Sequence, residues 1–378
     1  VERGDLSGLF VLVARDGEPV YSRASGHLDM ADQRPVGPDS LFRIFSMTKP
    51  VISAGIMKLV DQGKVNLDDP VADYIPEMAE LEVLAPSAES LDDTVALARP
   101  VTVFHLMTHT GGFDSLRRGR VPERAEGLSV LDATHDLATA TGRLAELPLV
   151  HQPGERWLYG AGFEPLARVI EVASGQSLQH FYRTEFFDPL GMEDTHFILP
   201  EGKADRLSGL YTKRGGALID LSRLRRTPFM SDPGTKLASG SGGLVSTGPD
   251  FLRFAEMLRQ GGRLNGVRIL SEAAVGQILS NQIAPDLPTG PPLDFREGYG
   301  FGFGGAVLVD AEAGAPATLG EYYWEGFANT LFWIEPETGV TVIALAQIIP
   351  YGTYPLAEEL KPLIREAVRI RARAQVKR

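Results

Sequence analysis

A serine and a lysine lie three residues apart at the predicted start of a mostly apolar helix, in the segment 41–63. Pro50 follows directly, and proline is tolerated only in a first helical turn, where its missing N–H has no intrahelical partner. Gly63 stands where a left-handed C-terminal cap is expected. The sequence therefore predicts a buried helix that begins close to Ser46, with Ser46 and Lys49 at its positive end.

This pair predicts nucleophilic chemistry. Side chains at i and i+3 share a helix face, so the Lys49 amine can reach the Ser46 hydroxyl. A serine hydroxyl is a poor nucleophile until a base takes its proton, and a desolvated lysine with a lowered pKa can do so. S-x-x-K is a known motif of this chemistry. Taken alone, the pattern also fits a capping serine followed by a solvated lysine, so other residues have to support the first interpretation.

Composition restricts the class of protein. With 378 residues, of which 43% are hydrophobic, the chain can bury one large core, and we expect a single domain over residues 1–378. The net charge of −12 disfavours nucleic acids and anionic membranes as partners. The chain has no apolar run of 18 residues and no signal-like first segment, which favours a soluble protein.

Metal and thiol chemistry are not expected. The chain contains no cysteine, which excludes disulfides, thiolate metal sites and cysteine nucleophiles, and leaves the compartment open. Its seven histidines show no metal-binding spacing. We expect no cofactor and no metal, and the sequence leaves the oligomeric state undetermined.

Hydrophobic periodicity and turn residues predict strands at both ends of the chain and helices between them. The first residues, 8–25, read as a hairpin around Asp16 and Gly17. Residues 113–150 look weakly helical, and 197–238 look like loops around a site. The other predicted elements are helices over 102–107, 164–173, 247–260 and 355–371, and strands over 302–310, 319–324, 330–335 and 340–348.

This order predicts an α+β fold. The N-terminal hairpin and the C-terminal strands form one antiparallel sheet flanked by helices, and a helical subdomain is inserted between them. The approximate division is an α/β part over 1–65 and 295–378 and a mainly helical part over 66–294. Ser46 then lies near the first crossing between the two parts, where ligand clefts commonly form.

Five motifs in this order resemble the serine β-lactamase and penicillin-binding-protein superfamily, and most closely class C β-lactamases and family VIII carboxylesterases. They are S-M-T-K at 46–49, L-M-T-H-T-G-G at 106–112, P-G-E-R-W-L-Y-G at 153–160, S-G-G-L-V-S-T at 241–247 and Y-G-F-G-F at 299–303. The resemblance runs from about Gly8 to the C-terminal helix. It implies the fold described above and an acyl-enzyme on Ser46.

The resemblance also implies a role for Tyr159, which stands where the family's Y-x-N tyrosine enters the site. Its partner position is Ala161 instead of asparagine. A phenol beside a lysine ammonium is stabilised as phenolate, so either Tyr159 or Lys49 can be the base, or the two can share the proton. The alternative for Tyr159 is a half-buried core tyrosine after a turn.

The family's third motif lies on a sheet strand beside the cleft, and Trp324, Glu325 and Gly326 stand at the matching place. Many family VIII esterases have W-G-G there, so Glu325 is a departure, although alternate strand residues face opposite sides. The resemblance makes Ala161, Trp324, Glu325 and Gly326 candidate substrate-binding residues. It also implies an oxyanion hole made by the backbone N–H groups of Ser46 and Phe327.

Two other segments resemble catalytic motifs, but we do not interpret them as such. His109 begins an H-T-G triplet, but the triplet precedes Tyr159 and is expected far from any C-terminal strand, so we interpret it as a helix-ending turn. Residues 239–243, S-G-S-G-G, nearly match the G-x-S-x-G nucleophile elbow, but residue 239 is serine and no strand is predicted to precede it.

The sequence thus predicts a serine hydrolase without a Ser-His-Asp triad, acting on a small-molecule carboxylic ester or a lactone. One alternative is a β-lactamase, or a D-amino-acid peptidase or transacylase of the same fold. Another is a non-catalytic receptor that is only acylated. The sequence does not identify the acyl group or the alcohol.

Overall fold

The computed structural model of the 378-residue chain describes residues 1–114, 132–224, 231–293, 297–312 and 318–376. Its main feature is an eight-stranded antiparallel sheet in the order β12-β13-β14-β15-β16-β1-β2-β3. The strands are β1 (Gly8–Arg15), β2 (Glu18–Asp29), β3 (Arg34–Pro35), β12 (Tyr299–Phe301), β13 (Ala306–Leu308), β14 (Tyr322–Gly326), β15 (Thr330–Glu335) and β16 (Val340–Leu345).

The two ends of the chain meet in this sheet. β1 pairs with β16 from Phe10 opposite Leu345 to Arg15 opposite Val340. Every residue of β14, β15 and β16 is buried, so the centre of the sheet is covered on both faces. The predicted α+β fold with one sheet from N- and C-terminal strands is confirmed.

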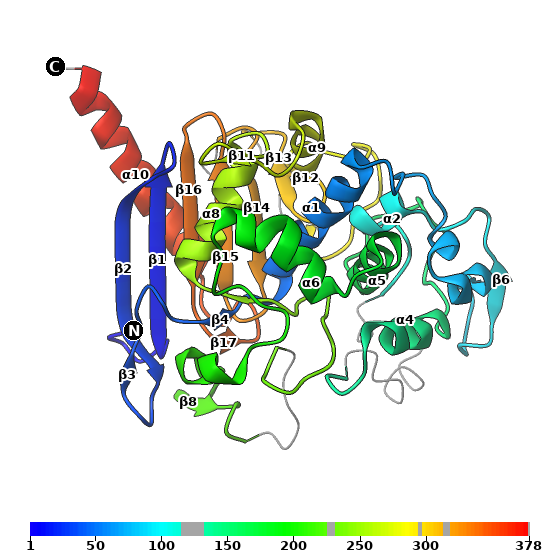
Figure 1. Cartoon of the computed structure of the whole chain (residues 1–378), viewed down its shortest axis with the longest axis horizontal. Coiled ribbons are helices and arrows are strands. Elements are labelled where there is room, and N and C mark those ends of the chain that lie inside the picture. Colours follow the sequence, from blue (N-terminus) through cyan, green and yellow to red (C-terminus); the bar gives the residue numbers. More distant parts are fainter. Residues whose placement is uncertain (115–131, 225–230, 294–296, 313–317, 377–378) are drawn as a thin grey trace.

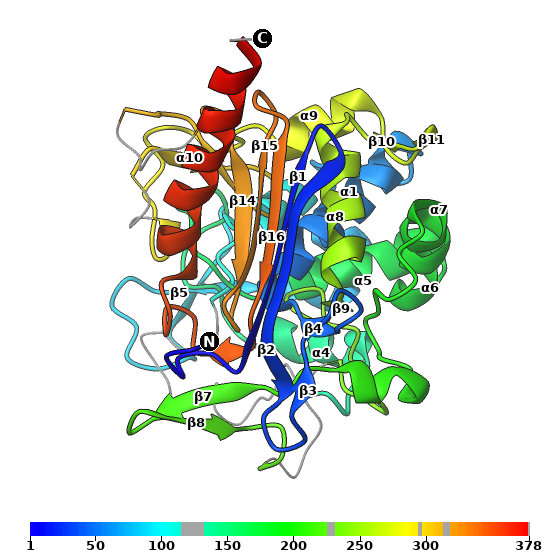
Figure 2. The same cartoon turned by 90° about the vertical axis from the view of Figure 1, so that its left-hand side faces the viewer.

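Helices cover both faces of the sheet (Figures 1 and 2). α8 (Gly248–Arg259) packs on β1, β15 and β16, and α1 (Thr48–Asp61) lies behind it, towards the helical part of the molecule. The Thr247 hydroxyl caps α8 by accepting from the Asp250 N–H. On the opposite face runs α10 (Leu356–Val376).

The helical part lies beyond α1 (Figure 1). The helix predicted at 164–173 is α5 (Phe163–Ser174), which ends at Gly175 with φ +70° as a left-handed cap requires. The further helices are α2 (Val103–Met107), α4 (Leu137–Ala145), α6 (Leu178–Tyr182), α7 (Asp188–Leu190) and α9 (Glu272–Ile278). The further strands are β4 (Phe42–Arg43), β5 (Glu82–Leu84), β6 (Thr94–Ala96), β7 (Tyr211–Arg214), β8 (Ala217–Asp220), β9 (Val245–Ser246), β10 (Arg263–Leu264), β11 (Val267–Arg268) and β17 (Ile348–Ile349).

Three of the observed strands begin or end at other residues than the sequence predicted. The strand expected over 302–310 is interrupted by a turn between β12 and β13, where Gly304 has φ +80°. A Cβ on Gly304 would lie 2.8 Å from the Lys49 carbonyl oxygen, so this turn packs against the first turn of α1. The strand expected over 319–324 begins at Tyr322 and continues to Gly326. The strand expected over 340–348 ends at Leu345, and Ile348 pairs with Tyr211 in a separate sheet.

Two regions were predicted only loosely. Within 113–150 the structure describes α4, while residues 115–131 lie outside the described residues. Within 197–238, expected to be loops, β7 and β8 form a hairpin that pairs with β17. The division into an α/β part and a helical part stays a prediction.

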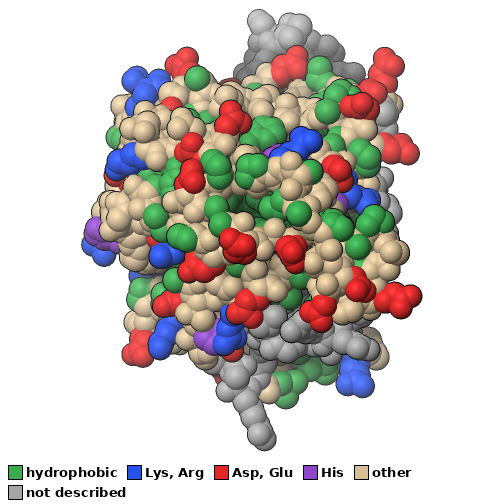
Figure 3. All heavy atoms as spheres, turned by 90° about the vertical axis from the view of Figure 1, so that its right-hand side faces the viewer, with side chains coloured by type: hydrophobic (Ala, Val, Ile, Leu, Met, Phe, Trp, Pro, Cys, Tyr) green, Lys and Arg blue, Asp and Glu red, His purple; other side chains and the backbone are tan. Residues whose placement is uncertain are grey.

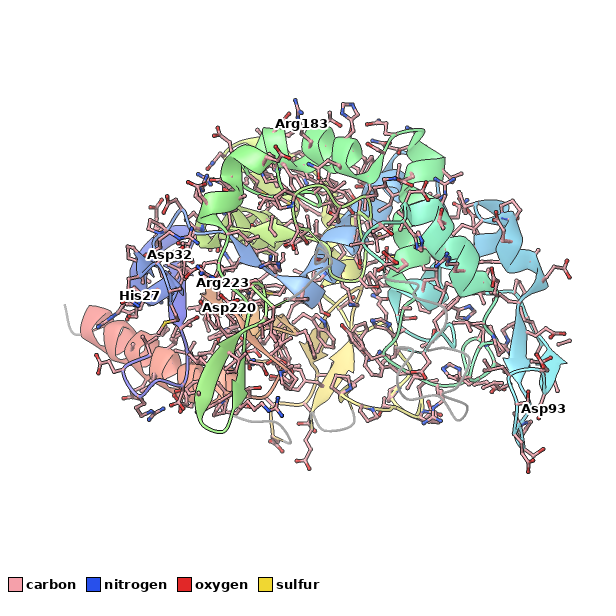
Figure 4. The ribbon with its side chains drawn as sticks, turned by 90° about the horizontal axis from the view of Figure 1, so that it is seen from below. His27, Asp32, Asp93, Arg183, Asp220 and Arg223 are labelled. Carbon is pink, nitrogen blue, oxygen red and sulfur yellow. The ribbon has the colours of Figure 1, made fainter. Side chains whose placement is uncertain are left out.

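Ion pairs tie the β7–β8 hairpin to the main sheet. The Arg223 guanidinium lies 2.8 Å from Asp29, 3.1 Å from Asp32 and 3.4 Å from Asp220, and Figure 4 shows Arg223 near Asp32 and Asp220. Acidic side chains are scattered over the face of the helical part that Figure 3 shows, in keeping with the net charge of −12. Among the described residues, none of the helices combines the length and the apolar character needed to cross a membrane.

α10 is held to the sheet by a buried carboxylate. Glu321 is fully buried, and each of its oxygens lies 2.6 Å from a cation of α10, Lys361 or Arg365. The Tyr299 hydroxyl donates to the same carboxylate at 2.9 Å. Because both cations are also largely buried, Glu321 compensates charges that water cannot solvate well.

Glu321→Ala should lower the free energy of unfolding by about 3 kcal/mol, because it leaves the largely buried Lys361 without its carboxylate partner and leaves Arg365 only Glu335, 3.6 Å away. Urea denaturation followed by circular dichroism measures this change. Glu272→Ala is the matched control: Glu272 pairs with Arg268 at 3.3 Å, but its side chain is 81% exposed, so the loss should stay below about 0.5 kcal/mol. Equal losses in both variants would contradict the anchoring role of Glu321.

Candidate active site

Ser46 lies in a short 3-10 turn, Phe45–Met47, that leads directly into α1. Lys49 follows in the first turn of α1 and is only 2% exposed. Its Nζ donates to Ser46 Oγ at 3.2 Å and to the Ser241 carbonyl oxygen at 2.7 Å. The Ser241 carbonyl, as a second acceptor, therefore holds the buried Lys49 amine towards Ser46. Because Lys49 is buried, the alternative interpretation of a capping serine followed by a solvated lysine does not hold for this pair.

Tyr159 reaches the same serine from the turn before α5. Its hydroxyl donates to Ser46 Oγ at 2.7 Å, and Lys49 Nζ lies 4.7 Å from the centre of its ring. Ser46 Oγ thus contacts both groups that can take its proton. The geometry brings the three predicted catalytic side chains together and leaves the identity of the base open between Lys49 and Tyr159.

Strand β14 brings the predicted substrate-binding residues beside this cluster. The Trp324 ring lies 5.6 Å from the Tyr159 ring, while the Glu325 carboxylate accepts from the Tyr351 hydroxyl at 2.7 Å. Successive side chains of a strand point to opposite faces, so Trp324 faces Tyr159 and Glu325 faces away from it. This agrees with the alternation that the sequence suggested.

Gly326 lets β14 approach the nucleophile turn. A Cβ at this position would overlap the Ile44 carbonyl oxygen and Thr330 Oγ1. The Thr330 hydroxyl donates to the Ile44 carbonyl at 3.1 Å, which fixes the two backbones side by side. The end of β14 is therefore held next to the turn that carries Ser46.

The remaining two predicted residues lie at the edges of the cluster. Phe327 follows β14, is 41% exposed, and its ring lies 6.1 Å from the Phe45 ring of the nucleophile turn. Ala161 is buried in the turn between Tyr159 and α5, and its N–H donates to the Asp114 carbonyl at 3.3 Å.

His109 lies closer to the site than the sequence suggested. It does follow the end of α2, in a left-handed conformation with φ +55°. However, its ring packs 4.7 Å from Tyr159 and 5.5 Å from Phe301 of β12, so the expectation that it lies far from any C-terminal strand was wrong. Burial, with a contribution from Lys49, lowers the pKa of His109 well below its usual value. His109 is therefore a neutral side chain that lines the site.

Glu164 was missed by the sequence analysis. It is fully buried in the first turn of α5, and its carboxylate accepts from Ser239 Oγ and from the N–H groups of Gly240 at 3.0 Å and Ser241 at 3.2 Å. Burial raises the pKa of Glu164, and the three donors oppose that rise. In the sequence Glu164 shares its helix face with Arg168 and Glu171, so no signal distinguished it from a solvated acidic residue.

The segment 239–243 has a supporting place in the site. The residues before it, 235–239, form no strand, as expected for a segment that is not a nucleophile elbow. Instead, its backbone supplies the Ser241 carbonyl that accepts from Lys49. Among the described residues, no group of three or more His, Cys, Asp or Glu side chains is arranged to hold a metal ion.

The chain is similar to known proteins over most of its length. A family model described as "Beta-lactamase" matches residues 1–364. The protein Rv1367c of Mycobacterium tuberculosis is 31% identical over 92% of this chain and 88% of its own length. Esterase EstB of Burkholderia gladioli is 31% identical over 96% of this chain and 91% of its own length.

A solved structure shares the fold. It is described as "EstCE1, a hydrolase with promiscuous acyltransferase activity", is 26% identical, covers 97% of this chain and 94% of its own, and superposes with a TM-score of 0.81. The chain belongs to the β-lactamase family.

Proposed function

We propose that this member of the β-lactamase family is a serine hydrolase that cleaves carboxylic esters through an acyl-enzyme on Ser46. The observation that carries the proposal is the position of Ser46 Oγ, 3.2 Å from Lys49 Nζ and 2.7 Å from the Tyr159 hydroxyl. The similarity to esterase EstB over 96% of the chain supports an ester as substrate.

The reaction proceeds in two halves. Ser46 Oγ attacks the ester carbonyl carbon, and its proton passes to the unprotonated member of the pair formed by Lys49 and Tyr159. The N–H groups of Ser46 and Phe327 stabilise the oxyanion. The intermediate collapses, and the alcohol leaves with the proton held by the pair. Water then attacks the carbonyl carbon of the acyl-enzyme, and the pair again takes the proton. The pair returns this proton to Ser46 Oγ as the acid is released.

The substrate is a neutral ester or a lactone. The resemblance to β-lactam-processing enzymes leads us to expect an asparagine at position 161 and a lysine at position 324, and this chain has Ala161 and Trp324. A methyl group neither donates nor accepts, and an indole offers an apolar face without positive charge. Glu325 faces away from Tyr159 and adds no repulsion at the site, so the missing asparagine amide and the missing lysine charge are what disfavour an anionic substrate.

Acyl transfer is a second candidate activity. The similarity to EstCE1, whose description names promiscuous acyltransferase activity, supports an acyl-enzyme that an alcohol can resolve in place of water. The same nucleophile and the same acyl-enzyme serve both outcomes. The competing proposals are a β-lactamase or D-amino-acid peptidase, and a receptor that is acylated without release. Turnover of an acylated Ser46 distinguishes the enzymes from the receptor.

Intact-mass spectrometry after treatment with a fluorophosphonate should find one adduct, on Ser46, and the enzyme should turn over a short p-nitrophenyl ester. Ser46→Ala should lose both the adduct and the turnover. Ser241→Ala is the matched control, because it removes the competing hydroxyl but keeps the carbonyl that accepts from Lys49. An adduct on Ser241, or full activity in Ser46→Ala, would refute the proposal, and labelling without turnover of any ester would favour the receptor.

Lys49→Ala and Tyr159→Phe should each lower kcat/KM for the ester nearly as much as the double variant does, because both groups contact the same oxygen and act as one proton-handling unit. The double-mutant cycle is measured with the p-nitrophenyl ester. Independent, additive losses would mean that one of the two groups only positions the other.

The wild type should have a higher kcat/KM for the p-nitrophenyl ester than for a chromogenic cephalosporin. The double variant Ala161→Asn, Trp324→Lys should shift this ratio towards the cephalosporin. The lysine contributes about tenfold to a hundredfold, since a charge-assisted hydrogen bond is worth about 1.5–3 kcal/mol, and the neutral asparagine amide contributes about twofold to tenfold. Trp324→Phe, which adds no charge, should cause no such shift. A wild type that prefers the cephalosporin would contradict the ester assignment.

A further inference from the structure

One buried carboxylate beside the site takes no part in the steps above. We infer that Glu164 is a positioning residue: it holds the segment Ser239–Gly243 so that the Ser241 carbonyl keeps Lys49 aimed at Ser46. The inference rests on the proposed function and adds to it the group that orients the lysine. Glu164 comes five residues after Tyr159 in the sequence, so one short stretch of chain supplies both the tyrosine and the group that orients the lysine.

The contacts of this segment show how rigidly it is held. Its three donors to Glu164 come from three consecutive residues, Ser239, Gly240 and Ser241. A Cβ on Gly240 would overlap the Phe163 carbonyl oxygen, so the segment lies directly on the first turn of α5. The Gly243 N–H donates to the Ser239 carbonyl at 2.9 Å, which closes the turn.

The same segment is attached to α1. The Leu244 N–H donates to Thr48 Oγ1 at 3.1 Å, one residue before Lys49 in the sequence. The Ser241 carbonyl then accepts from Lys49 Nζ at 2.7 Å, which is closer than Ser46 Oγ at 3.2 Å. The segment therefore bridges α5 and α1, and Glu164 is the group on the α5 side that fixes it.

Glu164→Gln tests the inference. A glutamine keeps the size of the side chain, but its NH₂ group replaces one of the two accepting oxygens and meets at least one N–H donor, so the segment should lose part of its attachment. We expect kcat for the p-nitrophenyl ester to fall by up to about a hundredfold with little change in KM, because a small misplacement of a catalytic group has effects of this size. The rate of fluorophosphonate labelling of Ser46 should fall in parallel.

Glu256→Gln is the matched control. Glu256 is also a buried carboxylate in a helix, α8, where it accepts from Thr341 Oγ1 at 2.6 Å and pairs with Arg259 at 2.8 Å. It should lower the melting temperature while leaving kcat and the labelling rate at their wild-type values. The inference is overturned if Glu164→Gln behaves in the same way.

Ser239→Ala gives a second route if Glu164→Gln does not fold. It removes one of the three donors and should lower kcat and the labelling rate by a smaller amount; unchanged values would overturn the inference. Fluorophosphonate labelling does not depend on the right ester being known. Failure of the inference is therefore distinct from failure of the proposed function, which would appear as activity or labelling that survives Ser46→Ala.

Discussion

The hydroxyl of Ser46 lies between the amine of Lys49 and the phenol of Tyr159, and much of the structure serves to hold these three groups together. Ser46 and Lys49 belong to one helix start, but Tyr159 is more than a hundred residues further along the chain. The meeting depends on α5 packing against α1, and on α1 packing beside the sheet. The two hydrogen bonds to Ser46 Oγ thus depend on an extensive apolar core.

Close backbone approach is the second requirement, and glycine supplies it. Gly326 allows β14 to lie against Ile44, directly before the nucleophile turn, and Gly304 allows the turn between β12 and β13 to lie against the Lys49 carbonyl. A larger residue at either position would push the sheet away from α1. The distance between the strand that carries Trp324 and the helix that carries Lys49 is therefore set by residues without side chains.

Burial makes the polar groups of the site effective and also restricts them. Lys49 is almost completely buried, so its hydrogen bonds to Ser46 and Ser241 are stronger than they would be in water. The same low polarity keeps His109 neutral and would make an unpaired Glu164 costly. Each ionisable group around the serine is therefore either matched by partners or held neutral.

The sequence by itself determined the features that depend on neighbours along the chain. The approach of Lys49 to Ser46, the cap at Thr247 and the left-handed Gly175 follow from short spacings, and the strands at both ends were enough to predict the α+β sheet. The ordered motifs also indicated Tyr159, although only as a resemblance. Tertiary structure alone decided that His109 packs on Tyr159 and that Glu164 orients a segment more than seventy residues away. These contacts join elements whose separation in sequence has no periodicity, so they arise only when the helices and the sheet are packed together.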